Sequence, residues 1–363
     1  MVASVGLIAL VSLLIGIIYL FFIRSFDIYE KDPWIKLFIS FLVGGLLSIF
    51  FVSVIYQFLE VEYRMSDAIL KIGLTEETAK MAAFFIIFMI FGKDINEPVD
   101  GILYMSAIAL GFACIESISY AMNSETPYLI LFFRAFVSVV GHITFTGYMG
   151  LALFIHLKVK HNYRGLVFSL ALATLFHGLY DGLLFNPGLN FIFKYLFVAA
   201  IVFHFYLIRI ALNFSGFRQK FSPGLFEEDK FTDLVNCIAC NSSDNNRQLT
   251  FWKIHPHRCS RCGNLIFTSH SFKMLLRYFR PVLRSGRYRR TLEKNRDSSG
   301  FSHIEGNIEL IYSPALQVFS MEPARLTEWI RSSYIEDCRN ALRMPVSGII
   351  LRYLGLRHLE NKI

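Results

Sequence analysis

The sequence predicts an all-α polytopic membrane protein of about seven transmembrane helices, followed by a small cytosolic α+β tail built on a zinc ribbon. Of the 363 residues, 54% are hydrophobic and only 18% are charged, whereas soluble domains usually contain about 25% charged residues. Long apolar runs are confined to residues 1–212, and two Cys-x-x-Cys pairs follow them. This pattern excludes a single soluble globule, a disordered chain and a small disulfide-stapled protein.

Seven apolar segments are candidates for membrane spans. A helix needs about 20 apolar residues to cross the hydrocarbon core of a bilayer. The candidates are residues 3–23, 35–58, 79–91, 101–122, 128–155, 166–185 and 190–212. No basic residue precedes the first segment, so we expect a membrane anchor there and not a cleaved signal peptide.

The basic residues of the loops predict an orientation, because cytoplasmic loops carry an excess of Lys and Arg. The richer set of alternate loops leads to the basic tail and holds Arg24, Lys31, Lys36, Lys93, Lys158, Lys160 and Arg164. The other set holds Arg64, Lys71 and Lys80. We therefore expect a multi-pass protein of the cell (plasma) membrane with its N-terminus outside and its C-terminal domain in the cytoplasm.

Charge divides the chain into a membrane part and a tail. Residues 1–212 have a net charge of −1, and residues 213–363 have a net charge of +9. We expect a transmembrane catalytic domain over 1–215, a linker over 216–230 and a zinc ribbon over 231–268. A basic amphipathic segment over 269–300 and a small C-terminal α/β region over 301–363 complete the expected organisation.

Ionisable side chains inside the predicted spans are the main indication of function, because such groups are costly in a membrane. They are Glu76, Glu77, Glu116, Arg134, His142, His177 and Asp181. Helical spacing puts Glu76 near Lys80 and His177 near Asp181 on shared faces. Following each span through the bilayer places the whole set in one half of the membrane, which predicts a single site.

A carboxylate pair and two imidazoles, held partly dry, can activate a water molecule. One glutamate would act as general base and one histidine would orient the water. The other histidine, together with Asp181, would donate to a developing oxyanion. A metal on Glu77, His142 and His177 is the alternative, since these are zinc-ligand types, but the absence of a His-Glu-x-x-His motif disfavours it. Purely structural roles, such as a helix–helix hydrogen bond for Glu116, also stay open.

Four motifs in order resemble the PrsW family of intramembrane proteases, which is related to the CAAX-prenyl endopeptidases and their bacteriocin-immunity relatives. The motifs are Glu76-Glu77-x-x-Lys80, Phe112-x-x-x-Glu116-x-x-x-Tyr120, a lone His142, and a glycine-flanked His177-x-x-x-Asp181. The stretch 27–34, with Pro33, is similar to that family's first loop, and the resemblance covers residues 1–215.

The resemblance implies a catalytic set and a class of substrate. The implied catalytic residues are Glu76, Glu77, Glu116, His142 and His177, with Asp181 as the polar oxyanion partner. The family includes proteases that start the cleavage of membrane-bound anti-sigma factors on the extracytoplasmic side, so a single-pass membrane protein is the implied substrate. Its members are often labelled metalloproteases, but these motifs fit a glutamate-activated water at least as well.

Four cysteines in the tail have the spacing of a structural zinc site. Cys237-x-x-Cys240 and Cys259-x-x-Cys262 are separated by 18 residues, as in zinc ribbons with four thiolate ligands. The alternative is two disulfides. Because zinc needs reduced thiols, the zinc prediction favours the cytosol and agrees with the orientation predicted from the loops.

Residues 272–296 form the basic amphipathic segment. Nine Lys or Arg and one acidic residue lie within 273–296. Such a segment next to a membrane most simply lies on anionic lipid. Nucleic acid is a disfavoured alternative, and a protein partner or a solvated face also stays open. The oligomeric state is not indicated.

The sequence thus predicts an intramembrane endopeptidase that is regulated or docked through its zinc ribbon. Two alternatives remain. An ion or proton translocator would need polar groups through the full thickness of the membrane, whereas these occupy one half. A non-enzymatic membrane-anchored zinc-ribbon adapter would not need the intact motifs.

Overall fold

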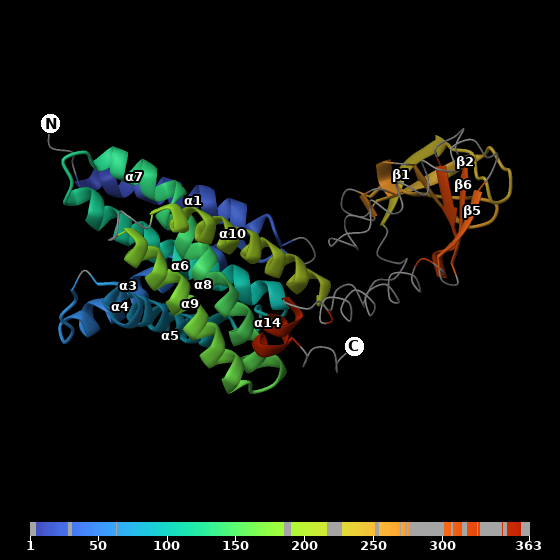
Figure 1. Cartoon of the computed structure of the whole chain (residues 1–363). Helices are drawn as coiled ribbons and strands as arrows, with labels where there is room; N and C mark the ends of the chain where they lie inside the picture. Colours follow the sequence, from blue (N-terminus) through green and yellow to red (C-terminus); the bar gives the residue numbers. More distant parts are fainter. Residues whose placement is uncertain are drawn as a thin grey trace. The chain divides into compact units, whose positions relative to one another are not determined.

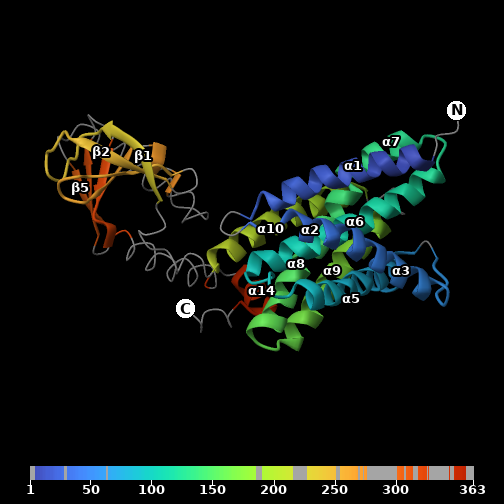
Figure 2. The same cartoon turned by 180° about the vertical axis from the view of Figure 1, so that it is seen from behind.

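The computed structural model describes residues 5–27, 31–62, 64–184, 190–215, 227–250, 254–268, 270–272, 274–275, 301–305, 308–313, 318–324, 326, 343 and 347–356. The chain forms two compact units, which are treated separately below. Unit 1 comprises Met1–Ser215 and Ala341–Ile363, and unit 2 comprises Gly216–Asn340. Unit 1 is helical and unit 2 is built on a sheet (Figures 1 and 2).

Unit 1 contains these helices, with π-helical turns marked η: α1 (Val5–Arg24), α2 (Trp34–Ile39), η1 (Ser40–Gly44), α3 (Gly45–Tyr56), α4 (Met65–Asp67), η2 (Ala68–Gly73), α5 (Leu74–Phe91), α6 (Pro98–Met122), α7 (Pro127–Phe136), α8 (Ser138–Phe154), η3 (Ile155–Val159), α9 (Tyr163–Leu184), α10 (Asn190–Asn213) and α14 (Ser347–Leu354). Within the described ranges, six helical segments are long and apolar enough to cross a membrane: Val5–Arg24, Trp34–Tyr56, Pro98–Met122, Pro127–Val159, Tyr163–Leu183 and Lys194–Leu212. The predicted polytopic all-α membrane part is confirmed.

The segment expected over 79–91 belongs to α5, which carries three charged residues in its first two turns. These are Glu76, Glu77 and Lys80, and they keep α5 outside the set of six. Helical backbone continues into α5 from α4 and η2 without a gap, so the helix as a whole starts at Met65. The charged residues therefore lie inside a long helix, where their side chains pack against other helices.

The core of unit 1 is formed by α6 and α8, whose residues are mostly buried. The two helices pass so closely that a Cβ atom on Gly101 or Gly150 would meet the backbone of the other helix. Gly45 and Gly111 permit a similar approach between α3 and α6. In Figures 1 and 2, α6 and α8 run between α1 and α10 on one side and α3 and α5 on the other. Small residues thus determine the packing, as is common between membrane helices.

The fifth predicted span, 128–155, is divided into two helices. Val137 has φ −111° and ψ −64°, which depart from ideal helical values, and it separates α7 from α8. Arg134 therefore lies on α7 and His142 on α8. The break lets the two side chains approach Glu116 from different directions.

Unit 2 contains a seven-stranded antiparallel sheet with strand order β1-β2-β3-β4-β7-β6-β5. The strands are β1 (Glu227–Leu234), β2 (Asn245–Thr250), β3 (His257–Arg258), β4 (Leu265–Thr268), β5 (Phe301–Glu305), β6 (Ile308–Ser313) and β7 (Val318–Met321). Pairing of β4 with β7, from Leu265 opposite Met321 to Thr268 opposite Val318, joins the cysteine-bearing strands to β5–β7. This sheet and its cysteine cluster confirm the small α+β tail of the predicted fold class.

The basic segment 272–296 lies almost entirely outside the described residues. Only Phe272, Met274 and Leu275 of it are described. Its proposed binding to anionic lipid therefore stays a prediction from the sequence.

Candidate functional site

Four helices of unit 1 bring the six candidate catalytic residues into one connected network. Glu76 and Glu77 lie in the first turn of α5, and Glu116 lies late in α6. His142 lies early in α8, and His177 and Asp181 lie late in α9. The contacts described below link all six, as helix direction alone predicts.

Glu77 is the most completely engaged carboxylate of the network. Its Oε1 accepts hydrogen bonds from Lys80 Nζ (2.7 Å) and from His177 Nδ1 (2.7 Å). Its Oε2 accepts a hydrogen bond from Thr146 Oγ1 (2.7 Å). The Glu77 and Lys80 side chains are both 0% exposed. With both oxygens occupied, Glu77 is suited to hold its neighbours in place and not to accept a proton from water.

Glu76 is held more loosely than Glu77, since its Oε2 lies 3.6 Å from Lys80 Nζ, beyond hydrogen-bond distance. Its Oε1 accepts a long hydrogen bond from the Tyr56 hydroxyl (3.4 Å), and its Oε2 is buried without a hydrogen-bond partner among the described residues. His177 Nε2 lies 3.5 Å from this oxygen and 3.5 Å from Asp181 Oδ2. Two carboxylates therefore flank one imidazole nitrogen, an arrangement that can hold and deprotonate a water molecule.

His142 bridges the buried and the more accessible part of the network. Its Nδ1 lies 3.1 Å from Lys80 Nζ, and its Nε2 lies 2.9 Å from Glu116 Oε2. An ammonium only donates and a carboxylate only accepts, so the imidazole accepts at Nδ1 and donates from Nε2. Glu116 also pairs with Arg134, whose Nε donates to Ser117 Oγ (3.0 Å).

The part of the network that is accessible to solvent is formed by residues of α6, α7 and α9. The side chains of Glu116, Arg134 and Asp181 are 21%, 17% and 20% exposed, whereas those of Glu76, His142 and His177 are 7% exposed or less. A substrate would therefore reach the buried groups past this partly exposed edge.

Close helix packing fixes the position of α9 against η2. A Cβ atom on Gly178 would overlap the backbone of Ile69, and one on Gly73 would overlap the Thr174 carbonyl oxygen. The glycine beside His177 thus lets α9 approach closely enough for the 2.7 Å contact with Glu77.

Two hydroxyl groups join the network, those of Thr146 and Tyr56, and sequence reasoning missed Tyr56. Thr146 lies one helical turn after His142, and this i,i+4 spacing predicts that the two share a helix face. Tyr56 ends α3, a helix without other candidate residues, so no local pattern pointed to it. Arg134, one of the ionisable residues of the predicted spans, pairs with Glu116.

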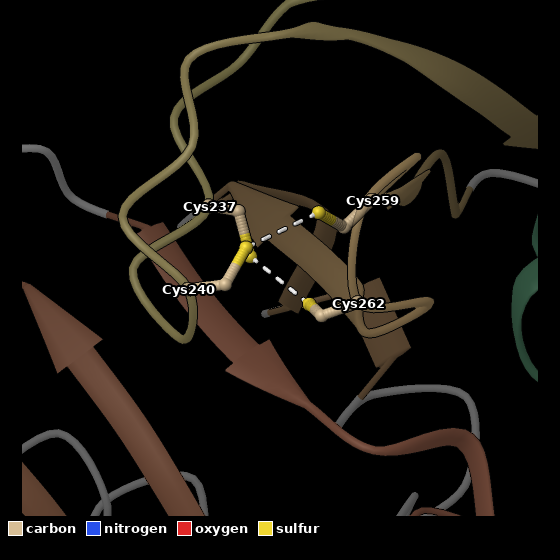
Figure 3. Close-up of side chains that lie close together, drawn as sticks. All are labelled: Cys237, Cys240, Cys259 and Cys262. Carbon is tan, nitrogen blue, oxygen red and sulfur yellow. Dashed lines mark hydrogen bonds between the residues drawn. The ribbon is translucent and has the colours of Figure 1, made fainter.

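The four cysteines of unit 2 converge on one point, as Figure 3 shows. The Sγ atoms of Cys237 and Cys262 lie 3.6 Å apart, and those of Cys240 and Cys259 lie 3.7 Å apart. All four Sγ atoms lie within 4.8 Å of one another, and none of these cysteines forms a disulfide. A tetrahedron with zinc–sulfur bonds of about 2.3 Å has edges of about 3.8 Å, so this thiol arrangement fits a tetrahedral metal ion.

Each Cys-x-x-Cys pair forms a similar tight turn. The residue after the second cysteine has a positive φ in both turns, 52° for Asn241 and 76° for Gly263. The first cysteine of each pair donates its N–H to the carbonyl five residues later: Cys237 to Ser242 (2.8 Å), and Cys259 to Asn264 (2.9 Å). Asparagine and glycine tolerate this left-handed conformation, which explains their positions.

The Cys259 thiol has the character of a metal ligand. Burial by itself would raise its pKa, but hydrogen bonds from the Cys262 and Arg261 backbone and from the Ser242 hydroxyl lower the pKa to about 6. A thiol of this kind is largely ionised at neutral pH, and the thiolate is the form that binds metal.

Comparison with known proteins gives a consistent result for unit 1. Residues 32–208 match the family described as "PrsW family intramembrane metalloprotease". "Protease PrsW" of Clostridioides difficile (strain 630) is 31% identical over 197 residues, 49% of this chain and 78% of the relative. "Protease PrsW" of Geobacillus kaustophilus (strain HTA426) is 33% identical over 178 residues, 47% of this chain and 76% of the relative. No solved structure matches the chain.

The family match ends at residue 208, before the cysteine pairs of unit 2. It covers the helices that carry the whole buried network of acidic and histidine side chains. The chain therefore belongs to the PrsW family of intramembrane proteases, and it is a multi-pass, membrane-embedded protease with an additional cysteine-bearing unit.

Proposed function

We propose that Glu76, Glu77, Glu116, His142, His177 and Asp181 form the catalytic centre of an endopeptidase in which Glu76 activates a water molecule. The observation that carries this proposal is Glu76 Oε2, which accepts no hydrogen bond from the described residues and has only the longer ion pairs with Lys80 Nζ (3.6 Å) and His177 Nε2 (3.5 Å). The neighbouring buried carboxylate, Glu77, already accepts three hydrogen bonds. This division of roles gives one carboxylate to chemistry and the other to positioning.

The proposed reaction is hydrolysis of a peptide bond in two steps. Glu76 takes a proton from water while the hydroxide attacks the scissile carbonyl carbon. His177, held by Glu77 at Nδ1, presents Nε2 to the reacting atoms, and Asp181 stabilises its protonated form. The proton on Glu76 then passes to the leaving nitrogen as the carbon–nitrogen bond breaks, which yields a carboxylic acid and an amine.

The family description implies a metal, and the chain offers a candidate set for one. Glu76, His142 and His177 each have a ligand atom within 4.8 Å of the others. In this arrangement, however, His142 uses one nitrogen toward the Lys80 ammonium and the other toward Glu116, so it has no lone pair left for a metal. The residues as placed do not fit a metal ion, and the mechanism above uses none.

The proposed substrate is a single-pass membrane-anchored protein, as in the anti-sigma-factor-like substrates implied by the family resemblance. The charged network lies toward the end of unit 1 at which α5 and α8 begin and α6 and α9 finish. If loop charge sets the orientation, this end is extracytoplasmic, and cleavage occurs near the outer membrane boundary. Unit 2 then lies in the cytoplasm, where its cysteines stay reduced and hold zinc.

Comparison of membrane proteomes tests the proposal. A strain carrying Glu76→Gln should accumulate one or more intact single-pass proteins that appear truncated in the wild type. Loss of a general base lowers the rate about 10²–10⁴-fold. Glu60→Gln, an exposed carboxylate in the loop before α4, is the matched control and should retain cleavage. Normal processing by Glu76→Gln protein would defeat the assignment.

A further inference from the structure

The C-terminal helix α14 belongs to unit 1, although the whole of unit 2 precedes it in the chain. Its residues Leu351 and Leu354 are 1% and 0% exposed, and Ile349 on its other side is 48% exposed. The Tyr353 ring stacks on the Phe168 ring of α9 with centroids 5.3 Å apart. The helix thus buries one apolar face against α9.

The end of α14 lies directly on the start of α9. Asn162 caps α9, since its Oδ1 accepts the Gly165 N–H (3.2 Å). Gly355, with φ 99°, lies so close that an added Cβ would be 2.5 Å from Asn162 Nδ2. The N–H of Leu356 bonds to the Leu351 carbonyl (3.1 Å), which completes a Schellman turn that buries Leu356.

The helix that α14 contacts is the one that carries two members of the proposed catalytic centre. His177 lies 14 residues after Tyr163, about 21 Å along α9. Tyr163 (69%) and Val167 (68%) in the first turns of α9 are exposed, and α14 packs on this part of the helix at Phe168 and next to Asn162. A helix moves largely as a rigid element, so a shift at its start changes the contact between His177 and Glu77.

We propose that Leu351, Tyr353 and Leu354 are positioning residues for the protease: by docking on α9 they hold His177 and Asp181 in register with Glu76 and Glu77. The inference rests on the proposed function of that site. Unit 2 is joined to unit 1 both at the end of α10 and before α14. A change in unit 2 can therefore alter the proposed catalytic centre through α14 and α9.

Unit 2 lies between α10 and α14 in the chain, so docking of α14 on α9 closes the chain segment that contains the sheet. Unfolding of the sheet lengthens the segment that docking closes, and closing a longer segment costs more entropy. We therefore expect anything that unfolds the sheet, such as loss of a structural metal, to loosen α14.

The test uses the full-length protein in detergent, measured by hydrogen exchange and by cleavage of the protein identified with the Glu76→Gln strain. Leu351→Ala should weaken docking about thirtyfold or more, since it removes a buried leucine from the contact. We expect faster exchange at Gly165, Gly355 and Leu356 and a lower kcat with KM unchanged. Leu351→Met should restore both readings, and Ile349→Ala, on the exposed side of α14, should match the wild type.

Zinc chelation tests the connection to unit 2. In the wild type, chelation should speed exchange at Gly355 and Leu356 and lower kcat. In Leu351→Ala protein it should add little further loss of kcat, because α14 is already released. Unchanged kcat in Leu351→Ala, while the wild type cleaves and Glu76→Gln does not, would overturn this inference and leave the proposed function intact. Normal cleavage by Glu76→Gln would instead overturn the proposed function.

Discussion

Lys80 shows at the residue scale how the candidate site is stabilised. Its ammonium is fully buried, 2.7 Å from Glu77 Oε1 and 3.6 Å from Glu76 Oε2, and it lies 4.2 Å from the centre of the Phe112 ring. A buried charge is tolerated only with good partners, and removal of one partner is more costly than removal of both. Lys80 therefore makes the two glutamates unequal: it donates a hydrogen bond to Glu77, whereas its ion pair with Glu76 Oε2 is longer and leaves that oxygen without a hydrogen bond from the described residues.

We predict that Glu77→Gln destabilises unit 1, unlike Glu76→Gln. The change leaves Lys80 without its nearest counter-charge, at a cost of about 3–5 kcal/mol. The double variant Glu77→Gln/Lys80→Met should recover most of this loss but remain inactive. Thermal unfolding in detergent measures the effect, with Glu62→Gln, half of an exposed pair with Arg64, as control. Equal unfolding temperatures for the two single variants would contradict the roles given to Glu76 and Glu77.

At the scale of elements, two short turns of the same geometry build the metal-binding site of unit 2. The first turn joins β1 to β2 and the second joins β3 to β4, and the two pairs meet because β2 and β3 are neighbours. Cys237 and Cys259 form a small buried cluster with Ile266, whereas Cys262 is exposed. A metal ion would therefore contribute directly to the stability of this sheet.

We predict that the full-length protein binds one zinc ion per chain and that Cys259→Ser abolishes this binding, since four thiolates are needed to complete the site. Metal analysis of the purified protein under reducing conditions checks both statements. Cys114→Ser changes a buried cysteine of α6 outside the cluster and should leave the zinc content unchanged. A metal ion that persists in Cys259→Ser protein would point to the membrane site and contradict the metal-free mechanism.

At the scale of the whole molecule, two independent features predict the same orientation. Loop Lys and Arg residues favour a cytoplasmic tail, and four thiols suited to zinc favour the same compartment. With this orientation the candidate catalytic network would lie in the outer half of the membrane. The proposed reaction and the cysteine-bearing unit would then be on opposite sides of the bilayer, which gives the α14–α9 contact its importance.

Labelling of introduced cysteines in intact cells tests this orientation. An impermeant thiol reagent should label Glu125→Cys, in the exposed loop after α6, because this loop is predicted to be outside. It should not label Lys93→Cys, in the exposed loop after α5, until the cells are permeabilised. Labelling of the native tail cysteines from outside would reverse the orientation and favour disulfides over zinc.

Much of the fold was predictable because membrane spans and metal motifs have strong local patterns. Long apolar runs predicted the helices, and the paired Cys-x-x-Cys spacing predicted the convergence of Cys237, Cys240, Cys259 and Cys262. The break at Val137 and the contact of Tyr56 with Glu76 were not predictable, since neither has a local signal. The pairing of β4 with β7 joins segments about 50 residues apart and depends on tertiary packing.

The sequence by itself determined a polytopic helical membrane part that resembles the PrsW proteases, a set of ionisable residues at one level of its helices, and four cysteines with the spacing of a metal site. Residue type, spacing and helix direction are sufficient for these conclusions because they follow from local periodicity and from the thickness of a bilayer. Only the tertiary structure decided which glutamate has an oxygen without a hydrogen bond from the described residues, that both nitrogens of His142 are engaged, and that α14 returns to α9. These features depend on distances between helices, and side-chain packing sets such distances among residues far apart in the chain.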